Sequence, residues 1–215
     1  MSRRYWIAAV SGLIWLLALV ACSGGRAVVG VEQSGEGAVG PQEIKNATEV
    51  VRFDPASLPT SGDAIPGACV ESATVPGTYR CDLEAGGAAE PCFALGGTRL
   101  LCGPNPAAGT YVALVSPTNT LPSVAPSSPD RAVEFFVEMS SGMTCAIRTG
   151  PEPVIIGGIA ARYDCSEPYT YILEGGQLTL DKSAPLWVAA VYTLDPATGE
   201  SSGKTPADIR RVWVP

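Results

Sequence analysis

The sequence predicts an all-β protein, a disulfide-stapled antiparallel β-meander or sandwich-like domain. Short apolar or alternating runs recur along the chain with Gly, Pro and Ser clusters between them, as in antiparallel sheets. No stretch shows an amphipathic helical pattern with capping residues at its ends. Six cysteines are spread over residues 69–165, which is typical of an exported, cross-linked domain. The domain is expected to follow an N-terminal leader.

The leader is an apolar run behind two arginines. Arg3 and Arg4 precede residues 7–20, which contain no charged side chain. The run is shorter than the roughly 20 residues of a membrane-spanning helix, and its flanks are those of a signal peptide. It ends in Leu19-Val20-Ala21-Cys22. This ending resembles the lipobox of bacterial lipoproteins.

The lipobox resemblance implies a lipid anchor. Residues 1–21 would be removed, and the thiol of Cys22, the new first residue, would carry diacylglycerol. Two or more acyl chains hold a protein stably at a membrane. The predicted location is therefore the cell membrane, lipid-anchored, on the extracytoplasmic side. The alternative is a plain signal peptide or membrane anchor with an incidental cysteine. Residues 22–45 lack a helical or strand period and are expected to form a lipidated, flexible tether.

Charge and the missing histidine exclude several classes of function. The chain has 14 basic residues; loss of Arg3 and Arg4 leaves 12 against 21 acids, so the mature net charge is 12 − 21 = −9. This balance disfavours binding to nucleic acid and to anionic lipid head groups. Histidine is absent, which removes Ser-His-Asp and Cys-His catalysis and histidine metal sites. We therefore expect no enzyme activity and no cofactor.

The cysteine count predicts three disulfides. Seven cysteines less Cys22 leave six, an even number in an exported chain. Several connectivities are open. The short separations favour sequential pairing, which joins Cys69 to Cys81, Cys92 to Cys102 and Cys145 to Cys165. The rival is a thiolate metal site. Zinc sites commonly use Cys-x2-Cys spacing, which this chain lacks.

Residues 46–116 are predicted to form a cysteine-rich β half. Strands are expected at residues 49–54, 77–83, 98–102 and 110–116. Pro55, Pro59 and Pro66 are expected to break the chain after the first of these. Residues 117–130 contain four prolines and few large apolar side chains. They are expected to form a linker or a long surface loop between two halves.

Residues 131–215 are predicted to form a β-meander half. Residues 132–139 alternate, so Glu134, Phe136 and Glu138 share one strand face. Further strands are expected at residues 144–148, 154–165, 170–173, 186–194 and 209–214. Gly157 and Gly158 suggest a kink or bulge within residues 154–165. Residues 195–204 are expected to form a long polar turn.

The cysteine surroundings resemble a recurrent pattern in actinobacterial, mycobacterial-type secreted proteins and lipoproteins of uncharacterised function. In that pattern an Arg-Cys, a Pro-Cys-Phe and a further Cys follow one another, and a second part adds two cysteines and two tryptophans. The matching segments here are residues 79–81, 90–93, 100–102, 141–145, 161–165 and 185–187, with Trp213. The resemblance covers roughly residues 67–214. It implies a disulfide-bonded extracytoplasmic domain and assigns no chemistry.

Two groups of carboxylates are candidates for chemistry. Asp82, Glu84 and Glu90 lie close together in the sequence and could form a calcium loop, although their spacing does not match an EF-hand. The alternative is a solvated acidic loop. Glu134 and Glu138 could act as paired carboxylates of a glycosidase-like site, or could simply belong to a polar sheet face.

Serine, lysine and tyrosine supply the remaining candidates. Ser166-Glu167 and Lys182-Ser183 offer serine and lysine, without a recognised nucleophile motif. Tyr169 and Tyr171 follow Cys165 in a loop-like region and are candidates for a binding surface for sugars, peptides or acyl chains. The alternative is that both pack in the core.

Together these observations favour a non-catalytic lipoprotein that binds an envelope protein, glycan or lipid. A carboxylate-dependent cell-wall hydrolase using Glu134 or Glu138 is one alternative. A lipid carrier with an apolar cavity between sheet faces is the other.

Overall fold

The computed structural model describes residues 47–128, 132–149, 152–173 and 179–215. These described residues belong to one compact unit. Cys22, the predicted leader and the predicted tether lie outside the described residues. Within the described ranges, no helix is long and apolar enough to cross a membrane.

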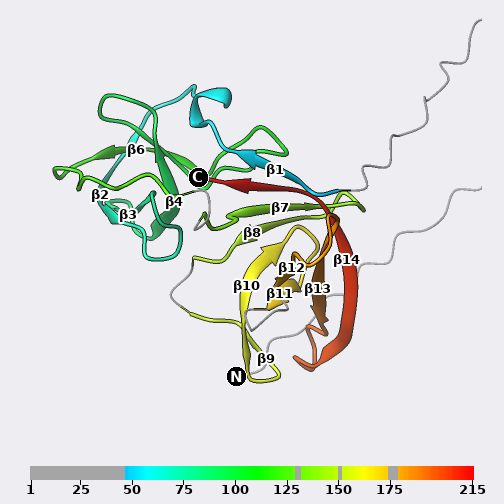
Figure 1. Cartoon of the computed structure of the whole chain (residues 1–215). Coiled ribbons are helices and arrows are strands. Elements are labelled where there is room, and N and C mark those ends of the chain that lie inside the picture. The colour runs from blue at the N-terminus through cyan, green and yellow to red at the C-terminus, as the bar shows by residue number, and fades with distance from the viewer. Residues whose placement is uncertain (1–46, 129–131, 150–151, 174–178) are drawn as a thin grey trace, which may run out of the picture. The chain divides into compact units, whose positions relative to one another are not determined.

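The described chain is almost entirely β-structure, which confirms the predicted fold class (Figure 1). The first half contains β1 (Glu49–Arg52), a 3-10 turn η1 (Pro55–Ser57), β2 (Ile65–Glu71), β3 (Tyr79–Leu83), β4 (Ala88–Ala94), β5 (Leu100–Cys102) and β6 (Ala113–Pro117). The second half contains β7 (Phe136–Met139), β8 (Thr144–Ile147), β9 (Ile155–Ile156), β10 (Ile159–Cys165), β11 (Thr170–Leu173), β12 (Leu180–Asp181), β13 (Trp187–Leu194) and β14 (Ser201–Val214).

Strands β2 to β6 form a closed barrel, here called the first ring. Each strand pairs antiparallel with the next along the chain, and β6 returns to pair with β2. An up-and-down ring with an odd number of strands must close on a parallel pair, and β2 and β6 run parallel. Gly67 permits close approach of β2 to both of its neighbours, because a Cβ there would lie 3.0 Å from the carbonyl oxygen of Asp82 in β3 and 3.2 Å from the side chain of Val115 in β6.

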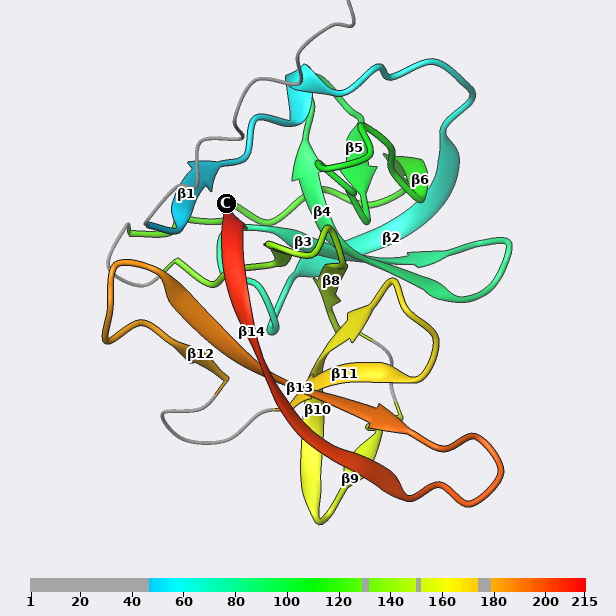
Figure 2. The same cartoon turned by 90° about the vertical axis from the view of Figure 1, so that its right-hand side faces the viewer.

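Strands β7, β8, β10, β11, β13 and β14 form the second ring (Figure 2). Each pairs antiparallel with the next, and the long strand β14 pairs with both β13 and β7. The predicted polar turn is therefore shorter than expected, because β14 begins at Ser201 and not at residue 209. The polar residues of β14 extend the strand through their pairing with β13.

Thr48 shows that β13 and β7 lie on opposite edges of β14. Its amide donates to the carbonyl of Pro185, and its hydroxyl donates to the carbonyl of Ile209 and accepts from the amide of Trp187. Strand β1 thus continues the edge of β14 where β13 begins, and pairs parallel with its C-terminal part. Because β7 occupies the other edge, the second ring closes.

Alternation within the first ring separates its interior from an outer apolar face. Cys92, Leu100 and Val115 belong to the core of the first ring. Their neighbours Phe93, Leu101 and Leu114 instead join the main core cluster, together with Phe135, Val137 and Met139 from the second half. The outer face of the first ring is therefore buried against residues of the second half.

An aromatic cluster marks this junction. The rings of Phe53 and Phe93 lie 4.8 Å apart between centroids, and Phe135 lies 5.4 Å from Phe53 and 5.1 Å from Phe93. These side chains come from the segment after β1, from β4 and from the segment before β7. Such edge-on and tilted contacts add to the energy of burial. The two halves therefore share one hydrophobic core.

Residues 118–128 lie along the first ring. The side chain of Asn119 donates to the carbonyl of Cys69 and accepts from its amide, at 2.8 and 2.7 Å. The hydroxyl of Tyr79 donates to the carbonyl of Pro122, and Leu121 and Val124 pack on the ring's core. Of the two expectations for this Pro-rich stretch, a surface loop describes it better than a linker.

Two expectations about prolines and glycines were wrong. Pro66 does not break the chain: it lies in β2 and its carbonyl accepts from the amide of Glu84. Gly157 and Gly158 do not make a kink within one strand. They form the two-residue turn between β9 and β10, because Ile156 pairs with Ile159 across them. Both glycines have positive φ, 58° and 82°, as a type I′ hairpin turn requires.

Candidate functional site

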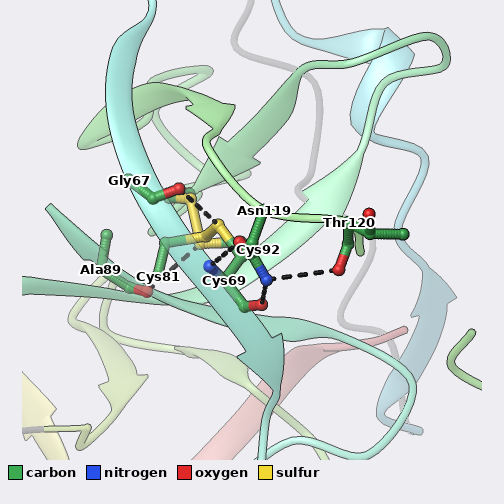
Figure 3. The surroundings of a disulfide bond; sticks show 8 residues. Gly67, Cys69, Cys81, Ala89, Cys92, Asn119 and Thr120 are labelled. Atoms are coloured by element: carbon green, nitrogen blue, oxygen red, sulfur yellow. Dashed lines mark hydrogen bonds between the residues drawn. A yellow bond between two sulfur atoms is a disulfide. The ribbon is translucent and has the colours of Figure 1, made fainter. Parts of the chain in front are cut away.

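The six cysteines form the three disulfides of the sequential pairing, which confirms that prediction. In each pair the two cysteines stand directly opposite on neighbouring antiparallel strands. Two disulfides, Cys69–Cys81 and Cys92–Cys102, lie side by side inside the first ring, with Asn119 against the first of them (Figure 3). The sulfurs of Cys81, Cys92 and Cys102 lie within 4.8 Å of one another, and each belongs to a disulfide. They are structural cross-links here, not thiolate ligands.

The candidate calcium loop separates into individual contacts. Asp82 accepts from Arg80 at 3.2 Å in an exposed ion pair. Glu90 accepts from the hydroxyl of Ser72, whose oxygen also accepts from the amides of Thr74 and Val75. In the described part of the chain, the carboxylates of Asp82, Glu84 and Glu90 do not gather around a common point.

Glu134 lies in a recess at the rim of the second ring. The recess has a volume of about 270 Å³ and is lined by Ala132, Val133, Glu134, Arg162, Tyr163, Thr179, Leu180 and Lys182. The carboxylate of Glu134 is 2.5 Å from the ammonium of Lys182. That ammonium also lies 4.7 Å from the centre of the Trp187 ring, in a cation–π contact. Glu134 is therefore a paired carboxylate.

Tyr163 forms the floor of this recess. The side chain is buried, and its hydroxyl donates to the backbone carbonyl of Glu134 at 2.8 Å. Burial, and then the negative charge of Glu134, raise the pKa of Tyr163 well above its usual value. Tyr163 therefore acts as a neutral hydrogen-bond donor that holds the segment before β7.

Glu138 belongs to a different group of charges. It faces Arg211 across the β7–β14 pair and lies 3.5 Å from both Arg210 and Arg211. Arg211 also pairs with Glu49 at 2.9 Å and lies over the Trp213 ring. The two glutamates of the hydrolase hypothesis therefore sit in separate ion-pair networks.

The serine and lysine candidates also lie in separate contacts. Ser166 accepts from the amide of Thr144 through its hydroxyl, next to the start of β8. Lys182 pairs with Glu134, and the amide of Ser183 donates to the carboxylate of Asp181. Hydrogen bonding with the side chain of Ser183, and then with its amide, lowers the pKa of Asp181.

Tyr171 lies on the outer face of the second ring. Tyr163, Ile172 and Val191 form a buried row across β10, β11 and β13. Alternation places the next row, which contains Tyr171 and Tyr192, on the opposite face. Asp164 and Lys204 flank this tyrosine pair on the adjoining strands.

A second, smaller apolar cluster covers this outer face. Ile156, Ala161 and Leu173 are buried beneath half-buried Val154, Tyr171, Tyr192 and Leu194. Three large apolar side chains close in sequence to the members of the cluster are exposed: Ile155 by 55%, Ile159 by 44% and Tyr169 by 53%. Ile159 stands opposite Ile156 and shares its face of the hairpin, whereas Ile155 stands opposite Ala160 and points to the other face. We call these three exposed side chains and the half-buried members of the cluster together the apolar patch; they are Val154, Ile155, Ile159, Tyr169, Tyr171, Tyr192 and Leu194.

Tyr169 joins the patch through its backbone. Its carbonyl accepts from the amide of Leu194 at 2.8 Å. Its φ is 57°, in the left-handed region that residues other than glycine rarely adopt. A tyrosine in this conformation with an exposed ring is a candidate for a functional position. Tyr169 and Tyr171 are thus both in the patch, one exposed and one half-buried.

The isoleucines of the patch were not predicted from the sequence. Residues 154–165 were expected to form one strand, in which Ile155 and Ile159 would have been core candidates. The Gly-Gly pair within an uncharged run was the available signal, since such a pair commonly marks a hairpin turn with outward side chains.

Comparison with known proteins finds no match to a protein-family model, to a curated protein or to a solved structure. The resemblance to actinobacterial lipoproteins therefore stays a prediction.

Proposed function

We propose that the mature chain is an extracytoplasmic lipoprotein, anchored through a lipid on Cys22, whose non-catalytic β domain binds a cell-envelope component through the apolar patch. The observation that carries the proposal is an outward-facing apolar cluster whose neighbouring segments expose Ile155 and Ile159 in the β9–β10 hairpin and Tyr169 before β11. Contiguous exposed apolar patches are uncommon on soluble proteins, and large ones mark interaction sites.

The disulfides support the extracytoplasmic part of the proposal. Three cross-strand disulfides persist in an oxidising compartment and are rare in a reducing one. The apolar run before Cys22 supplies both the export signal and the lipid attachment in this proposal.

Binding is favoured over the two alternatives. The carboxylates of Glu134 and Glu138, which a hydrolase would use, lie in separate ion-pair networks with Lys182 and with Arg210 and Arg211. The centre of the second ring is filled by buried side chains such as Ile147, Tyr163 and Ile172. The recess beside it is lined by the charged side chains of Glu134, Arg162 and Lys182 as well as by apolar ones. A lipid carrier would instead need an apolar cavity.

The anchor is tested by the mass of the protein isolated from the membranes of producing cells. The native chain is expected to begin at Cys22 and to carry the added mass of diacylglycerol. The Cys22→Ala variant is expected to stay unprocessed at this position. Normal processing of the variant would contradict the anchor.

The patch is tested with oxidised protein from Ser23 onward, mixed with envelope fragments of the producing organism. The double variant Ile155→Asp with Ile159→Asp is expected to lose retention on the fragments. The matched control, Val70→Asp with Val112→Asp, changes two other exposed apolar side chains and is expected to be retained. Equal retention of both double variants would remove the patch from the proposal.

A further inference from the structure

The β9–β10 hairpin carries the most exposed part of the apolar patch. Residues 153–161 contain no charged or polar side chain, and Ile155 and Ile159 flank the Gly157-Gly158 turn. The turn lies at the lower end of the second ring in both Figure 1 and Figure 2. Its tip is therefore narrow, convex and wholly apolar.

Many backbone hydrogen bonds of the hairpin are made within the hairpin itself. Ile159 pairs with Ile156 and Ala160 with Ile155, and the amide of Ala161 donates to the carbonyl of Val154 at 2.7 Å. Apolar surroundings are costly for a backbone with unpaired polar groups. A self-paired hairpin is a form in which a short segment can enter such surroundings.

We propose that this hairpin is a membrane contact whose tip, residues 155–159, enters the surface of the bilayer that holds the lipid on Cys22. The inference rests on the proposed function, because it names the envelope component that the patch meets. The side chains of Ile155 and Ile159 would lie among the outer acyl segments, and the charged residues at the base of the hairpin, such as Arg162, would stay at the head groups.

The chain outside the described structure brings this partner close. Between Cys22 and Ala47 there are 46 − 22 = 24 residues. Fully extended, they span at most about 80 Å. A compact domain of the size of residues 47–215 measures about 40 Å across. The lipid on Cys22 can therefore place any face of the domain at the membrane, and it holds the bilayer at a high effective concentration.

The size and charge of the tip favour a bilayer over a protein partner. A stable protein interface buries roughly 800 Å² on each side and contains hydrogen bonds and anchoring side chains in pockets. The tip offers two exposed isoleucines on a convex turn, and their surface is too small for such an interface. In a chain that is already anchored by a lipid, burial of these two side chains is enough to orient the domain at the membrane. Because the tip is uncharged, its contact should not require anionic lipid.

The test uses the lipid-bearing mature chain in phosphatidylcholine vesicles, with and without brominated acyl chains that quench tryptophan fluorescence. Ile155→Trp places a reporter at the tip, and Val70→Trp places one at a site of similar exposure on the first ring. The signal of the parent chain, from Trp187 and Trp213, is subtracted. Flotation of the vesicles shows separately whether the chain is anchored.

Brominated lipid is expected to quench the Ile155→Trp reporter and to leave the Val70→Trp reporter unquenched. Adding Ile159→Asp to the Ile155→Trp chain should abolish the quenching, while the chain still floats. Equal quenching of the two reporters in chains that float would overturn the proposal. So would a blue shift of the Ile155→Trp emission that rises with protein concentration without lipid, since a second copy would then cover the tip.

A failure of the anchor is distinguishable from a failure of the hairpin. If the chain does not float, the proposed lipid on Cys22 is wrong. The same reporters are then measured on vesicles with nickel-chelating lipid, which hold the chain by a polyhistidine tag in place of residues 1–22. Selective quenching there supports the hairpin contact, and its absence contradicts it.

Discussion

At the scale of single residues, Thr48 connects three strands that are far apart in the sequence. Its hydroxyl donates to the carbonyl of Ile209 at 2.7 Å and accepts from the amide of Trp187 at 2.8 Å. One side chain thereby fills the position where β1 replaces β13 beside β14. A hydroxyl that both donates and accepts cannot be replaced by a methyl group without leaving backbone groups unpaired.

We therefore predict that Thr48→Val, which keeps the shape of the side chain, lowers the free energy of unfolding by about 1–2 kcal/mol. Denaturant unfolding measures this change. The control is Thr198→Val, whose hydroxyl accepts one hydrogen bond, from Glu200, in an exposed turn. That variant should stay within about 0.5 kcal/mol of the parent. Equal losses in the two variants would contradict the role of Thr48.

Tyr163 makes the free energy of unfolding fall as the pH rises into the alkaline range. Its pKa is raised in the folded protein, by burial first and by the charge of Glu134 second. Above about pH 10 the unfolded tyrosine releases its proton while the folded one keeps it, so stability falls as pH rises. The slope contributed by Tyr163 is at most about 1.4 kcal/mol per pH unit.

The prediction is that Tyr163→Phe unfolds more easily at neutral pH but has a shallower loss of stability above pH 10. Urea unfolding at several pH values, compared between parent and variant, isolates this contribution. Parallel pH profiles would show that the hydroxyl of Tyr163 ionises in the folded protein as it does in the unfolded chain.

The residue-scale features differ in how far the sequence reveals them. The disulfide pairs follow from an even count and short separations, because nearby cysteines in a meander readily stand opposite one another. The role of Thr48 could not be predicted, because its partners lie 139 and 161 residues away. The same holds for the separation of Glu134 from Glu138, which depends on cations contributed by β14 and by the segment after β12.

At the scale of elements, the β9–β10 hairpin depends on backbone conformation at its turn. A Cβ on Gly157 would meet no atom within 4 Å, so a substitution there acts through φ alone. Its φ of 58° suits asparagine and glycine and disfavours β-branched residues.

We predict that Gly157→Val costs the hairpin about 1–3 kcal/mol, whereas Gly157→Asn is nearly neutral. Hydrogen exchange of the Ala161 amide reports the opening of the hairpin, because this amide donates to Val154. Exchange should accelerate about tenfold or more in the valine variant and little in the asparagine variant. The prediction fails if both variants exchange like the parent.

The strands that the sequence predicts well are those with a clear apolar run between turn residues. Strands β11 and β13 match their predicted ranges to within one residue. Strands β2 and β4 were missed because each contains a proline, at Pro66 and Pro91, that the ring accommodates. The length of β14 was missed because polar residues of its first half pair with β13 by tertiary contact, which outweighs local propensity.

At the scale of the whole described domain, the first ring is inserted in the chain between β1 and β7, which both pair with β14. Strand β1 pairs with β14, and the chain then passes through the first ring before it returns to β7. The aromatic cluster of Phe53, Phe93 and Phe135 joins the two rings. This arrangement predicts that the rings unfold together.

Accordingly, Phe93→Ala should lower the free energy of unfolding by about 3–5 kcal/mol. Tryptophan fluorescence, which reports on Trp187 and Trp213, and amide exchange in β3 should give one common transition. Val112→Ala, at an exposed side chain, is the control and should change stability by about 0.5 kcal/mol or less. Two separate transitions would mean that the rings are independent.

The fold class follows from the sequence because strand patterning and cysteine count are local properties. The closure of two rings does not, since it depends on long-range pairing of β2 with β6 and of β13 with β14. The proposed binding surface stays a prediction. Tyr169 and Tyr171 are aromatic candidates from the sequence, whereas the exposure of Ile155 and Ile159 depends on the turn between β9 and β10.

The central claim is that the apolar patch faces a component of the envelope. Its most direct test places a photo-cross-linking amino acid at Ile155 in the full chain, in cells that produce the protein. A second chain carries it at Val70, which has a similar exposure on the first ring. The account predicts lipid or envelope-protein adducts at position 155 and few at position 70. Equal yields at the two positions, or none at position 155, would contradict it.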